Sequence, residues 1–265
     1  DNLKYLMLNL GDIAYWDRRY EDEQTKNIGF KNFDWYCPFT RIYPTISSMV
    51  DMSGTHKVLV IGVGKSNIIE CLYKNGFRDI TAIDISSKVI QEMQREYTSY
   101  TGVEFYVMDV KEMIKFSSET FTIVFDKACV DCLFCGTDFM SATKRAFSEI
   151  FRVMKKESTF ISISHGSPIT RVPLFRAVNW AIECYKIDED IGESLTLYTL
   201  MKTSNEFLLK KRIVGGDMAK REKMVGLMDK AVSKKKAGKV AGSLTVTSNT
   251  DDLDELLAES AERDG

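Results

Sequence analysis

The chain has 265 residues, of which 44% are hydrophobic, 11% aromatic and 28% charged, and its formal net charge is −2. This length and composition are typical of a soluble globular protein with one large domain or two small ones, and they exclude a disulfide-stabilised mini-protein. The nearly balanced charge gives the chain no overall attraction to nucleic acid or to an anionic membrane surface.

Short apolar runs alternate with helical patterns along most of the chain. Five of these runs predict buried strands, at residues 57–61, 79–83, 104–108, 121–125 and 159–164. The spacing of apolar residues between them predicts helices at 67–75, 87–100 and 140–155, with helix residues in the core at Met93, Tyr97, Tyr100, Phe147 and Phe151. Because the strands are continuously apolar and separated by helices, we expect a parallel sheet covered on both faces.

The pattern changes toward the end of the core. Two strand-like runs, 181–187 and 195–203, are separated only by a turn, which predicts an antiparallel hairpin at one edge of the sheet. Residues 208–265 contain no Phe, Tyr or Trp. A segment without aromatic residues rarely builds a core, so we expect a polar, flexible tail. The three leucines at positions 253–257 leave open a short amphipathic helix that docks on a partner.

Three features of the sequence indicate the cellular compartment. No apolar run reaches the roughly 18 residues that a membrane-spanning helix requires. The first residues lack a basic stretch followed by a small-residue cleavage site, so we expect no signal peptide. The six cysteines show no framework spacing, which indicates reduced thiols. These features predict a cytoplasmic protein that does not contact a membrane.

The first predicted strand leads into the segment Gly62-Val63-Gly64-Lys65-Ser66, for which three ligand classes compete. A P-loop requires a glycine at position 59, but Leu59 lies inside the strand, so the loop is too short to wrap a phosphate. The dinucleotide fingerprint requires a third glycine at position 67, which is Asn67. The third class is a nucleoside without a pyrophosphate, such as S-adenosylmethionine. Its methionine carboxylate would face the N–H groups at the start of the next helix, which Ser66 or Asn67 would cap.

Two acidic residues favour the nucleoside interpretation. Asp84 ends the second strand about 20 residues after Gly62, where a carboxylate accepts hydrogen bonds from both ribose hydroxyls. Asp109 follows the third strand and is placed to reach an adenine edge. Both acids stand at the carboxyl ends of neighbouring strands, the edge at which open α/β sheets bind ligands. The alternative is that each acid only caps the helix that follows it.

These residues resemble a known family. The motifs that carry the resemblance are YWDRRY (15–20), DWY (34–36), VLVIGVGKS (58–66), TAIDIS (81–86), MDV (108–110) and FDKACVDCL (125–133). Over roughly residues 13–203 the chain resembles the seven-β-strand, S-adenosylmethionine-dependent protein lysine methyltransferases. It is most similar to the eukaryotic branch that methylates translation elongation factor 1-alpha.

The resemblance implies a fold and a division of the chain. The expected fold is α/β, a Rossmann-like class I methyltransferase with a seven-stranded, mostly parallel sheet, an antiparallel edge hairpin and helices on both faces. Residues 1–55 would form an N-terminal helical lid over the cofactor, and residues 56–207 the methyltransferase core. The tail at 208–265 lies beyond the resemblance.

The resemblance also implies a role for individual side chains. Asp84 would hold the ribose, Asp109 and Val110 would frame the adenine, and the aromatic residues would cover the methionine end. The expected contacts of S-adenosylmethionine, or of its product S-adenosylhomocysteine, are Trp16, Tyr20, Trp35, Gly62, Gly64, Asp84, Ile85, Asp109, Val110 and Lys127. The candidate catalytic residues are Lys127 beside the reacting methyl group, and Asp126 and Asp131, which would orient the acceptor amine.

Three positions depart from the family pattern. Lys65 replaces the family's asparagine after the glycine motif, Asp126 replaces a glutamate, and Ala128-Cys129 replaces Gly-Thr. These changes affect the expected geometry of the acceptor site more than cofactor binding.

The implied activity is transfer of a methyl group to a lysine of a protein, with elongation factor 1-alpha as the favoured partner and the enzyme acting as a monomer. A small-molecule acceptor and a catalytically silent S-adenosylmethionine-binding module are the alternatives. A nucleic-acid acceptor is disfavoured. Methyltransferases that act on exocyclic base amines carry [DN]-P-P-[YF] after strand four, whereas this chain has Asp126-Lys127-Ala128-Cys129, with no aromatic residue to stack on a flipped base.

A metal site is not expected, although Cys129, Cys132 and Cys135 have a suggestive C-x-x-C-x-x-C spacing. An iron–sulfur cluster would want a fourth cysteine at position 139, which is Phe139. Successive cysteines are three residues apart, which places their thiols along one side of a helix and favours buried free cysteines. His165, which follows the fifth strand, lines the acceptor entrance or has only a structural role.

Overall fold

The computed structural model describes residues 10–25, 34–50, 55–136, 138–187, 195–205 and 213–214. All of them belong to one compact unit, Asp1–Asp217. Apart from residues 213–214, the predicted tail lies outside the described ranges, as do the three leucines at positions 253–257.

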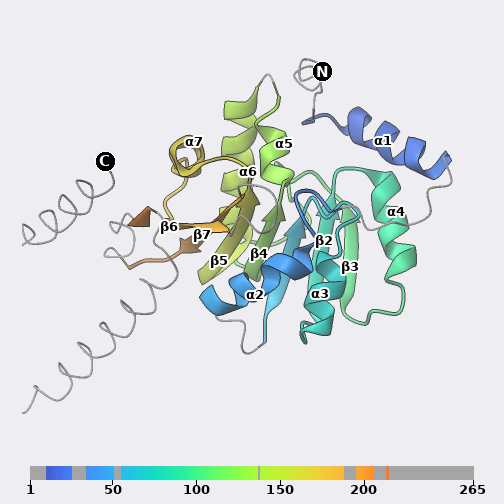
Figure 1. Cartoon of the computed structure of the whole chain (residues 1–265), viewed down its shortest axis with the longest axis horizontal. Coiled ribbons are helices and arrows are strands. Elements are labelled where there is room, and N and C mark those ends of the chain that lie inside the picture. The colour runs from blue at the N-terminus through green and yellow to red at the C-terminus, as the bar shows by residue number, and fades with distance from the viewer. Residues whose placement is uncertain are drawn as a thin grey trace, which may run out of the picture. The chain divides into compact units, whose positions relative to one another are not determined.

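One mixed sheet forms the centre of this unit (Figure 1). Five parallel strands are β1 (Lys57–Ile61), β2 (Asp79–Asp84), β3 (Val103–Val107), β4 (Phe121–Lys127) and β5 (Met154–Ser164). The antiparallel pair β6 (Ala181–Ile187) and β7 (Leu195–Lys202) extends the sheet beyond β5. The strand order is β3-β2-β1-β4-β5-β7-β6-β8. The predicted mostly parallel sheet with an antiparallel edge hairpin is therefore confirmed.

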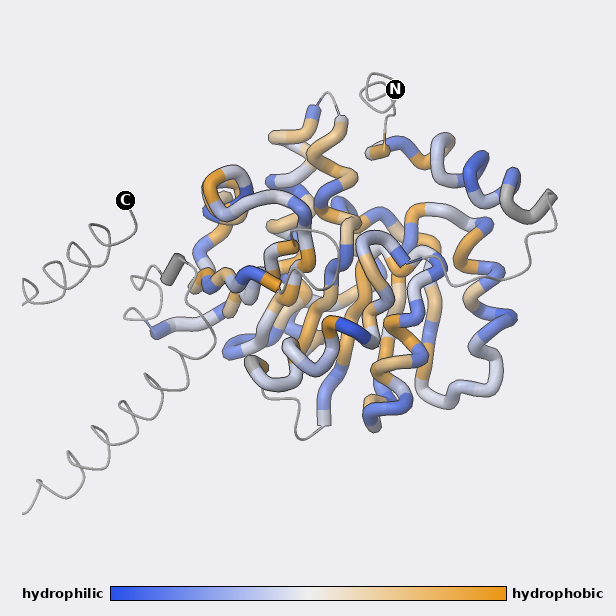
Figure 2. The backbone as a smooth tube through the Cα atoms, in the orientation of Figure 1, coloured by the Kyte–Doolittle hydropathy of each residue, from blue (hydrophilic) through white to orange (hydrophobic). Residues whose placement is uncertain are grey.

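Helices cover both faces of the sheet. The helices among the described residues are α1 (Ile13–Thr25), α2 (Phe39–Met49), α3 (Ile68–Lys74), α4 (Ser87–Glu96), α5 (Cys129–Leu133), α6 (Phe139–Val153) and α7 (Pro168–Phe175). Side chains alternate between the two faces along each strand. Val58 and Val60 of β1 accordingly share a core with α1 to α4, whereas Leu59 and Ile61 share a second core with α5 to α7. Figure 2 shows hydrophobic residues gathered along the central strands.

The predicted elements differ from the structure at several places. The helix expected at 87–100 ends at Glu96. The helix expected at 140–155 ends at Val153, because Met154 is fully buried and pairs with Phe121 of β4, so that strand pairing overrides the helix preference of the lysines that follow. A two-residue strand, β8 (Ile213–Val214), pairs with β6 inside the range predicted to be tail. The range predicted as a lid contains α2, whose Phe39 and Ile42 are fully buried in the core.

Most of the expected core positions in the helices are confirmed. Met93, Tyr97 and Phe147 are buried, and Tyr100 and Phe151 are partly buried against the two cores. Among the residues that the structure describes, none of the helices combines the length and the apolar character that crossing a membrane requires.

Candidate active site

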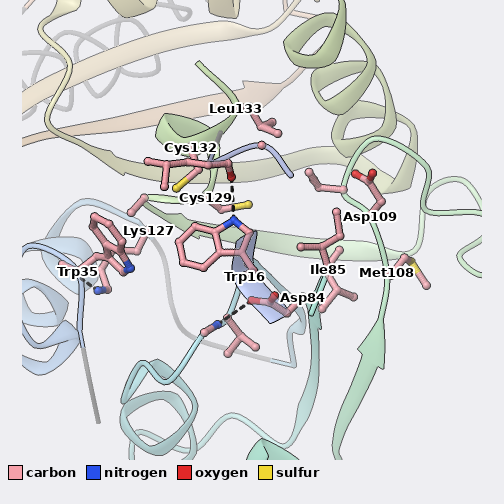
Figure 3. Close-up of a pocket in the computed structure, with 18 of the residues that line it drawn as sticks. Trp16, Trp35, Asp84, Ile85, Met108, Asp109, Lys127, Cys129, Cys132 and Leu133 are labelled. Carbon is pink, nitrogen blue, oxygen red and sulfur yellow. Dashed lines mark hydrogen bonds between the residues drawn. The ribbon is translucent and has the colours of Figure 1, made fainter. Parts of the chain in front are cut away.

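A pocket lies where β1, β2 and β4 end at their carboxyl side (Figure 3). Its empty space, including the open solvent at its mouth, is about 880 Å³. All ten residues expected to contact the cofactor line this pocket: Trp16, Tyr20, Trp35, Gly62, Gly64, Asp84, Ile85, Asp109, Val110 and Lys127. Residues from α1, from the segment at 34–36 and from four strand ends thus meet at one place.

The glycine segment after β1 brings the backbone to the floor of the pocket. Gly62 has φ +56° and Gly64 has φ +51°, a left-handed conformation that favours glycine. A Cβ atom on Gly62 would lie 2.4 Å from the Cβ of Cys129, so only a hydrogen fits between this loop and α5. The loop therefore offers its backbone, and no side chain, to a ligand at this position.

Asp84 connects the glycine loop to the loop after β2. Its Oδ2 accepts a hydrogen bond from the Gly64 N–H at 3.0 Å, and its Oδ1 accepts one from the Ser86 N–H at 3.0 Å. The side chain is buried, and this burial raises the pKa of Asp84 to about 6, although the N–H groups of Ser86 and Gly64 partly oppose the shift. The carboxylate is ionised above that pH and lines the pocket as an acceptor, whereas the N-cap residue of α4 is Ser86.

Asp109 lies on the other side of the pocket, beyond β3. Its Oδ1 accepts a hydrogen bond from the Lys111 N–H at 2.8 Å, and its Oδ2 lies 3.3 Å from the Lys111 ammonium. The side chain is partly exposed. These contacts hold the loop after β3 in a turn and leave the carboxylate at the pocket surface.

Aromatic residues from two segments cover one side of the pocket. The rings of Trp16 and Tyr20 are stacked with centroids 6.0 Å apart, and Trp16 meets Trp35 edge to face at 6.2 Å. The Trp16 indole N–H donates to the Leu10 carbonyl at 2.7 Å, and the Arg19 guanidinium lies 5.7 Å and 5.4 Å from the rings of Trp16 and Trp35. In Figure 3, Trp16 lies between Asp84 and Cys129, so the expected aromatic cover is assembled over the pocket floor.

Lys127 forms a buried ion pair that local sequence patterns did not reveal. Its Nζ lies 3.0 Å from the Asp34 Oδ1, with both side chains only 4% exposed, and donates to the Trp35 carbonyl at 2.7 Å. The Asp34 Oδ2 accepts a hydrogen bond from the Asn67 N–H at 3.2 Å. A protein carboxylate thus occupies the start of α3, where a cofactor carboxylate was expected. The only sequence signal for Asp34 was its place in the DWY motif.

The two aspartates proposed to orient the acceptor lie in different surroundings. Asp126 is fully buried and does not line the pocket; it accepts hydrogen bonds from the Val130 N–H at 3.1 Å and the Ser162 Oγ at 2.6 Å. Burial raises the pKa of Asp126 to about 7. Asp131 does not line the pocket either, although the next residue of α5, Cys132, does. It accepts a hydrogen bond from the Tyr36 hydroxyl at 2.7 Å.

The departures from the family pattern have local partners. The buried Lys65 ammonium lies 2.7 Å from a Glu92 carboxylate oxygen and 5.8 Å from the centre of the Tyr20 ring. Cys129 and Cys132 line the pocket, and burial raises the pKa of both thiols, which keeps them neutral. Within the described part of the chain, no three potential metal-binding side chains come together.

Comparison with known proteins shows what the chain is similar to. Residues 59–162 match the family model described as a methyltransferase domain. The chain is 30% identical over 157 residues to the human eEF1A lysine and N-terminal methyltransferase, a match that covers 58% of this chain and 21% of that protein. It is 22% identical over 215 residues to the bovine EEF1A lysine methyltransferase 4, covering 78% and 81% of the two chains. The chain therefore spans about a fifth of the length of the first of these relatives.

Solved structures share the fold. The phosphoethanolamine N-methyltransferase 2 of Haemonchus contortus aligns with a TM-score of 0.52 and 12% identity, covering 72% of this chain and 58% of that one. The PH0226 protein of Pyrococcus horikoshii aligns with a TM-score of 0.50 and 20% identity, covering 62% and 90%.

The chemical groups that line the pocket fit S-adenosylmethionine. It offers a glycine backbone floor, a buried carboxylate for a ribose and an aromatic cover, and it lacks the long loop that a pyrophosphate requires. Together with the matched domain, these features support S-adenosylmethionine as the cofactor. Residues 59–162 match a methyltransferase domain, and the chain is similar to the eukaryotic methyltransferases named for eEF1A.

Proposed function

We propose that this protein is an S-adenosylmethionine-dependent methyltransferase that methylates a lysine side chain of a protein, with elongation factor 1-alpha as the favoured acceptor. The observation that carries the proposal is the convergence of all ten expected cofactor contacts on one pocket. The relatives named for eEF1A support the acceptor. The proposal includes action in the cytoplasm, as a monomer that binds one protein acceptor.

The residues of the pocket would act mainly by binding and positioning. S-adenosylmethionine supplies a methyl group on a positively charged sulfur, which a nucleophile displaces in line, so the protein contributes geometry and a dry site. Asp84 would accept the ribose hydroxyls, and Trp16 and Trp35 would exclude water from the methionine end. The ion pair of Asp34 with Lys127 would hold Trp35 in place, because the Lys127 ammonium binds the Trp35 carbonyl.

The acceptor lysine must be neutral when it reacts. With a reference pKa of about 10.4, the neutral amine costs about 4 kcal/mol at pH 7.4. Partial desolvation of the amine at the pocket rim and the nearby positive sulfur would both lower this cost. The buried walls formed by Trp35, Cys129 and Cys132 provide such surroundings.

A transfer assay tests the proposal. Purified protein is mixed with radiolabelled S-adenosylmethionine and either recombinant elongation factor 1-alpha or a methylation-deficient cytosolic extract. We expect one labelled protein band at the mass of elongation factor 1-alpha, and mass spectrometry then locates the lysine. Asp84→Ala should abolish the label. The matched control is Asp79→Ala, at the exposed start of the same strand, which should keep it.

The alternatives give different results in this assay. Label only in the small-molecule fraction would indicate a metabolite acceptor. No label in any fraction, with S-adenosylhomocysteine binding intact by calorimetry, would indicate a catalytically silent binding module.

A further inference from the structure

A hydrogen-bonded pair, Tyr36 and Asp131, lies beside the cofactor pocket. The Tyr36 hydroxyl donates to the Asp131 Oδ2 at 2.7 Å. The same carboxylate accepts hydrogen bonds from the Ser164 Oγ at 2.6 Å, the His165 N–H at 3.0 Å and the Arg171 Nε at 3.1 Å. Four donors from three separate segments therefore satisfy this carboxylate and fix its position.

The pair lies beside the pocket without lining it. Tyr36 follows Trp35 in the chain and interacts electrostatically with Cys132, and both Trp35 and Cys132 line the pocket. The Tyr36 side chain is only partly buried, and its ring packs edge to face against the exposed His165, with centroids 4.1 Å apart.

The backbone holds Tyr36 in a conformation that a bulky residue seldom adopts. Tyr36 has φ +73°, and the Cys37 N–H donates to the Trp35 carbonyl at 2.9 Å, which closes a three-residue γ-turn around it. The Trp35 carbonyl also accepts a hydrogen bond from Lys127. Left-handed backbone at such a residue costs about 1–3 kcal/mol and persists at functional sites where the surroundings enforce it. The turn thus fixes the direction of the phenol.

We propose that the Tyr36 hydroxyl accepts a hydrogen bond from the acceptor lysine and orients its amine toward the methyl group, with Asp131 as the positioning residue. This inference rests on the proposed function. A hydroxyl that donates to a carboxylate is a better hydrogen-bond acceptor. Burial and the neighbouring Asp131 raise the pKa of Tyr36, so the hydroxyl keeps its proton and acts by orientation and not as a base.

The chemical step balances without a further reactant. The acceptor ammonium first loses one proton to water. The nitrogen lone pair then forms the new N–C bond as the C–S bond breaks, and the electron pair of that bond stays on the sulfur. The products are a methylammonium ion and a neutral thioether.

Tyr36→Phe is the direct test, because it removes the hydroxyl and keeps the ring against His165. With elongation factor 1-alpha as the acceptor, we expect kcat to fall at least tenfold, with the KM for S-adenosylmethionine unchanged. The affinity for S-adenosylhomocysteine by calorimetry should stay within twofold and the thermal midpoint within about 2 °C. The matched control is Tyr106→Phe, a partly buried tyrosine of β3 that does not line the pocket and whose hydroxyl donates to Glu104, which should leave all of these values unchanged.

A second variant, Asp131→Asn, keeps an oxygen acceptor for Tyr36 but removes the charge. We expect kcat to fall three- to tenfold, again with unchanged affinity for S-adenosylhomocysteine. A Tyr36→Phe protein with wild-type kcat would overturn the inference, and so would one that has lost S-adenosylhomocysteine binding, because the role of the hydroxyl would then be structural. Absence of transfer by the unaltered protein would instead overturn the proposed function, and the amine site with it.

Discussion

At the scale of single residues, Gly62 marks the closest approach between the cofactor loop and α5. A Cβ atom at this position would meet the Cβ and Sγ of Cys129 at 2.4 Å and 2.6 Å, and φ is +56°. We expect Gly62→Ala to destabilise the fold by at least about 2 kcal/mol and to abolish S-adenosylhomocysteine binding, because the loop must move away from α5. Denaturant unfolding and calorimetry measure the two effects.

Gly76→Ala is the control for backbone strain alone. Gly76 has φ +96°, and a Cβ atom on it would meet nothing within 4 Å. The Gly76→Ala substitution should lower the free energy of unfolding by about 1–2 kcal/mol and leave S-adenosylhomocysteine binding intact. If Gly62→Ala behaved like Gly76→Ala, the tight contact with Cys129 would have no part in the site.

Asp84 should make cofactor binding depend on pH. Burial raises its pKa to about 6, and ribose hydroxyls need the ionised carboxylate as acceptor. We therefore expect the affinity for S-adenosylhomocysteine to fall as the pH drops below 6, by up to tenfold per pH unit. Calorimetry from pH 5 to pH 8 measures this affinity. Asp84→Asn should bind weakly with a flat profile, and a wild-type profile that is flat between pH 5 and pH 7 would contradict the expectation.

The raised pKa of Asp84 makes the ligand-free protein less stable as the pH rises, which is opposite to its effect on cofactor binding. Between about pH 4 and pH 6, the folded state holds a proton on Asp84 that the unfolded chain has lost. This contribution to stability is therefore fully present below about pH 4 and is lost as the pH rises through about 6. Cofactor binding and the stability of the free protein thus favour opposite protonation states of one carboxyl group.

Not all of the site could be inferred from single residues in the sequence. The acids Asp84 and Asp109 could be predicted, because parallel strands bring their carboxyl ends to one edge. The pairing of Asp34 with Lys127 could not, because it joins distant parts of the chain and no local periodicity records it. The same holds for Tyr36 and Asp131, which are 95 positions apart.

At the scale of elements, polar contacts hold α1 against the start of α4. The Ser86 Oγ donates to the Asp17 Oδ1 at 2.6 Å, and the Lys88 ammonium lies 3.2 Å from Glu21. Removing one such hydrogen bond typically costs about 0.5–1.5 kcal/mol. Because α1 carries Trp16 and Tyr20, we expect Ser86→Ala to weaken S-adenosylhomocysteine binding about three- to tenfold.

The loss should appear mainly as faster ligand dissociation, which stopped-flow tryptophan fluorescence measures. The control, Ser148→Ala on the exposed side of α6, should leave the dissociation rate unchanged. An unchanged rate in Ser86→Ala would mean that the contact with Asp17 does not help to hold α1 over the ligand.

Elements with strong apolar patterns were predictable, and those defined by long-range pairing were not. The start of β5 was missed because Met154 joins the sheet through Phe121, while the lysines that follow favour a helix. The helix α7 has eight residues, too few for a clear helical period. A helix at α5 was indicated only by the spacing of its cysteines, and it ends at Leu133, before Cys135.

At the scale of the molecule, the pocket depends on the sheet more than on the end of the chain. Every pocket residue lies between Leu10 and Leu133, but β4 is covered by β5, and β5 is covered by the hairpin of β6 and β7. The compact unit that contains all of these strands ends at Asp217. We therefore expect residues 1–217 alone to unfold in one cooperative transition and to bind S-adenosylhomocysteine within twofold of the full chain.

A shorter chain that ends at Ser164 tests whether the antiparallel hairpin is required. It keeps every pocket residue but exposes the edge of β5 and the apolar side chains that pack on Leu197, Tyr198 and Leu200, all fully buried in the intact protein. An open apolar edge favours aggregation over folding, so we expect no cooperative transition and no ligand binding. Binding by this chain would show that the five parallel strands suffice. Loss of binding by residues 1–217 would show that residues 218–265 contribute to the site.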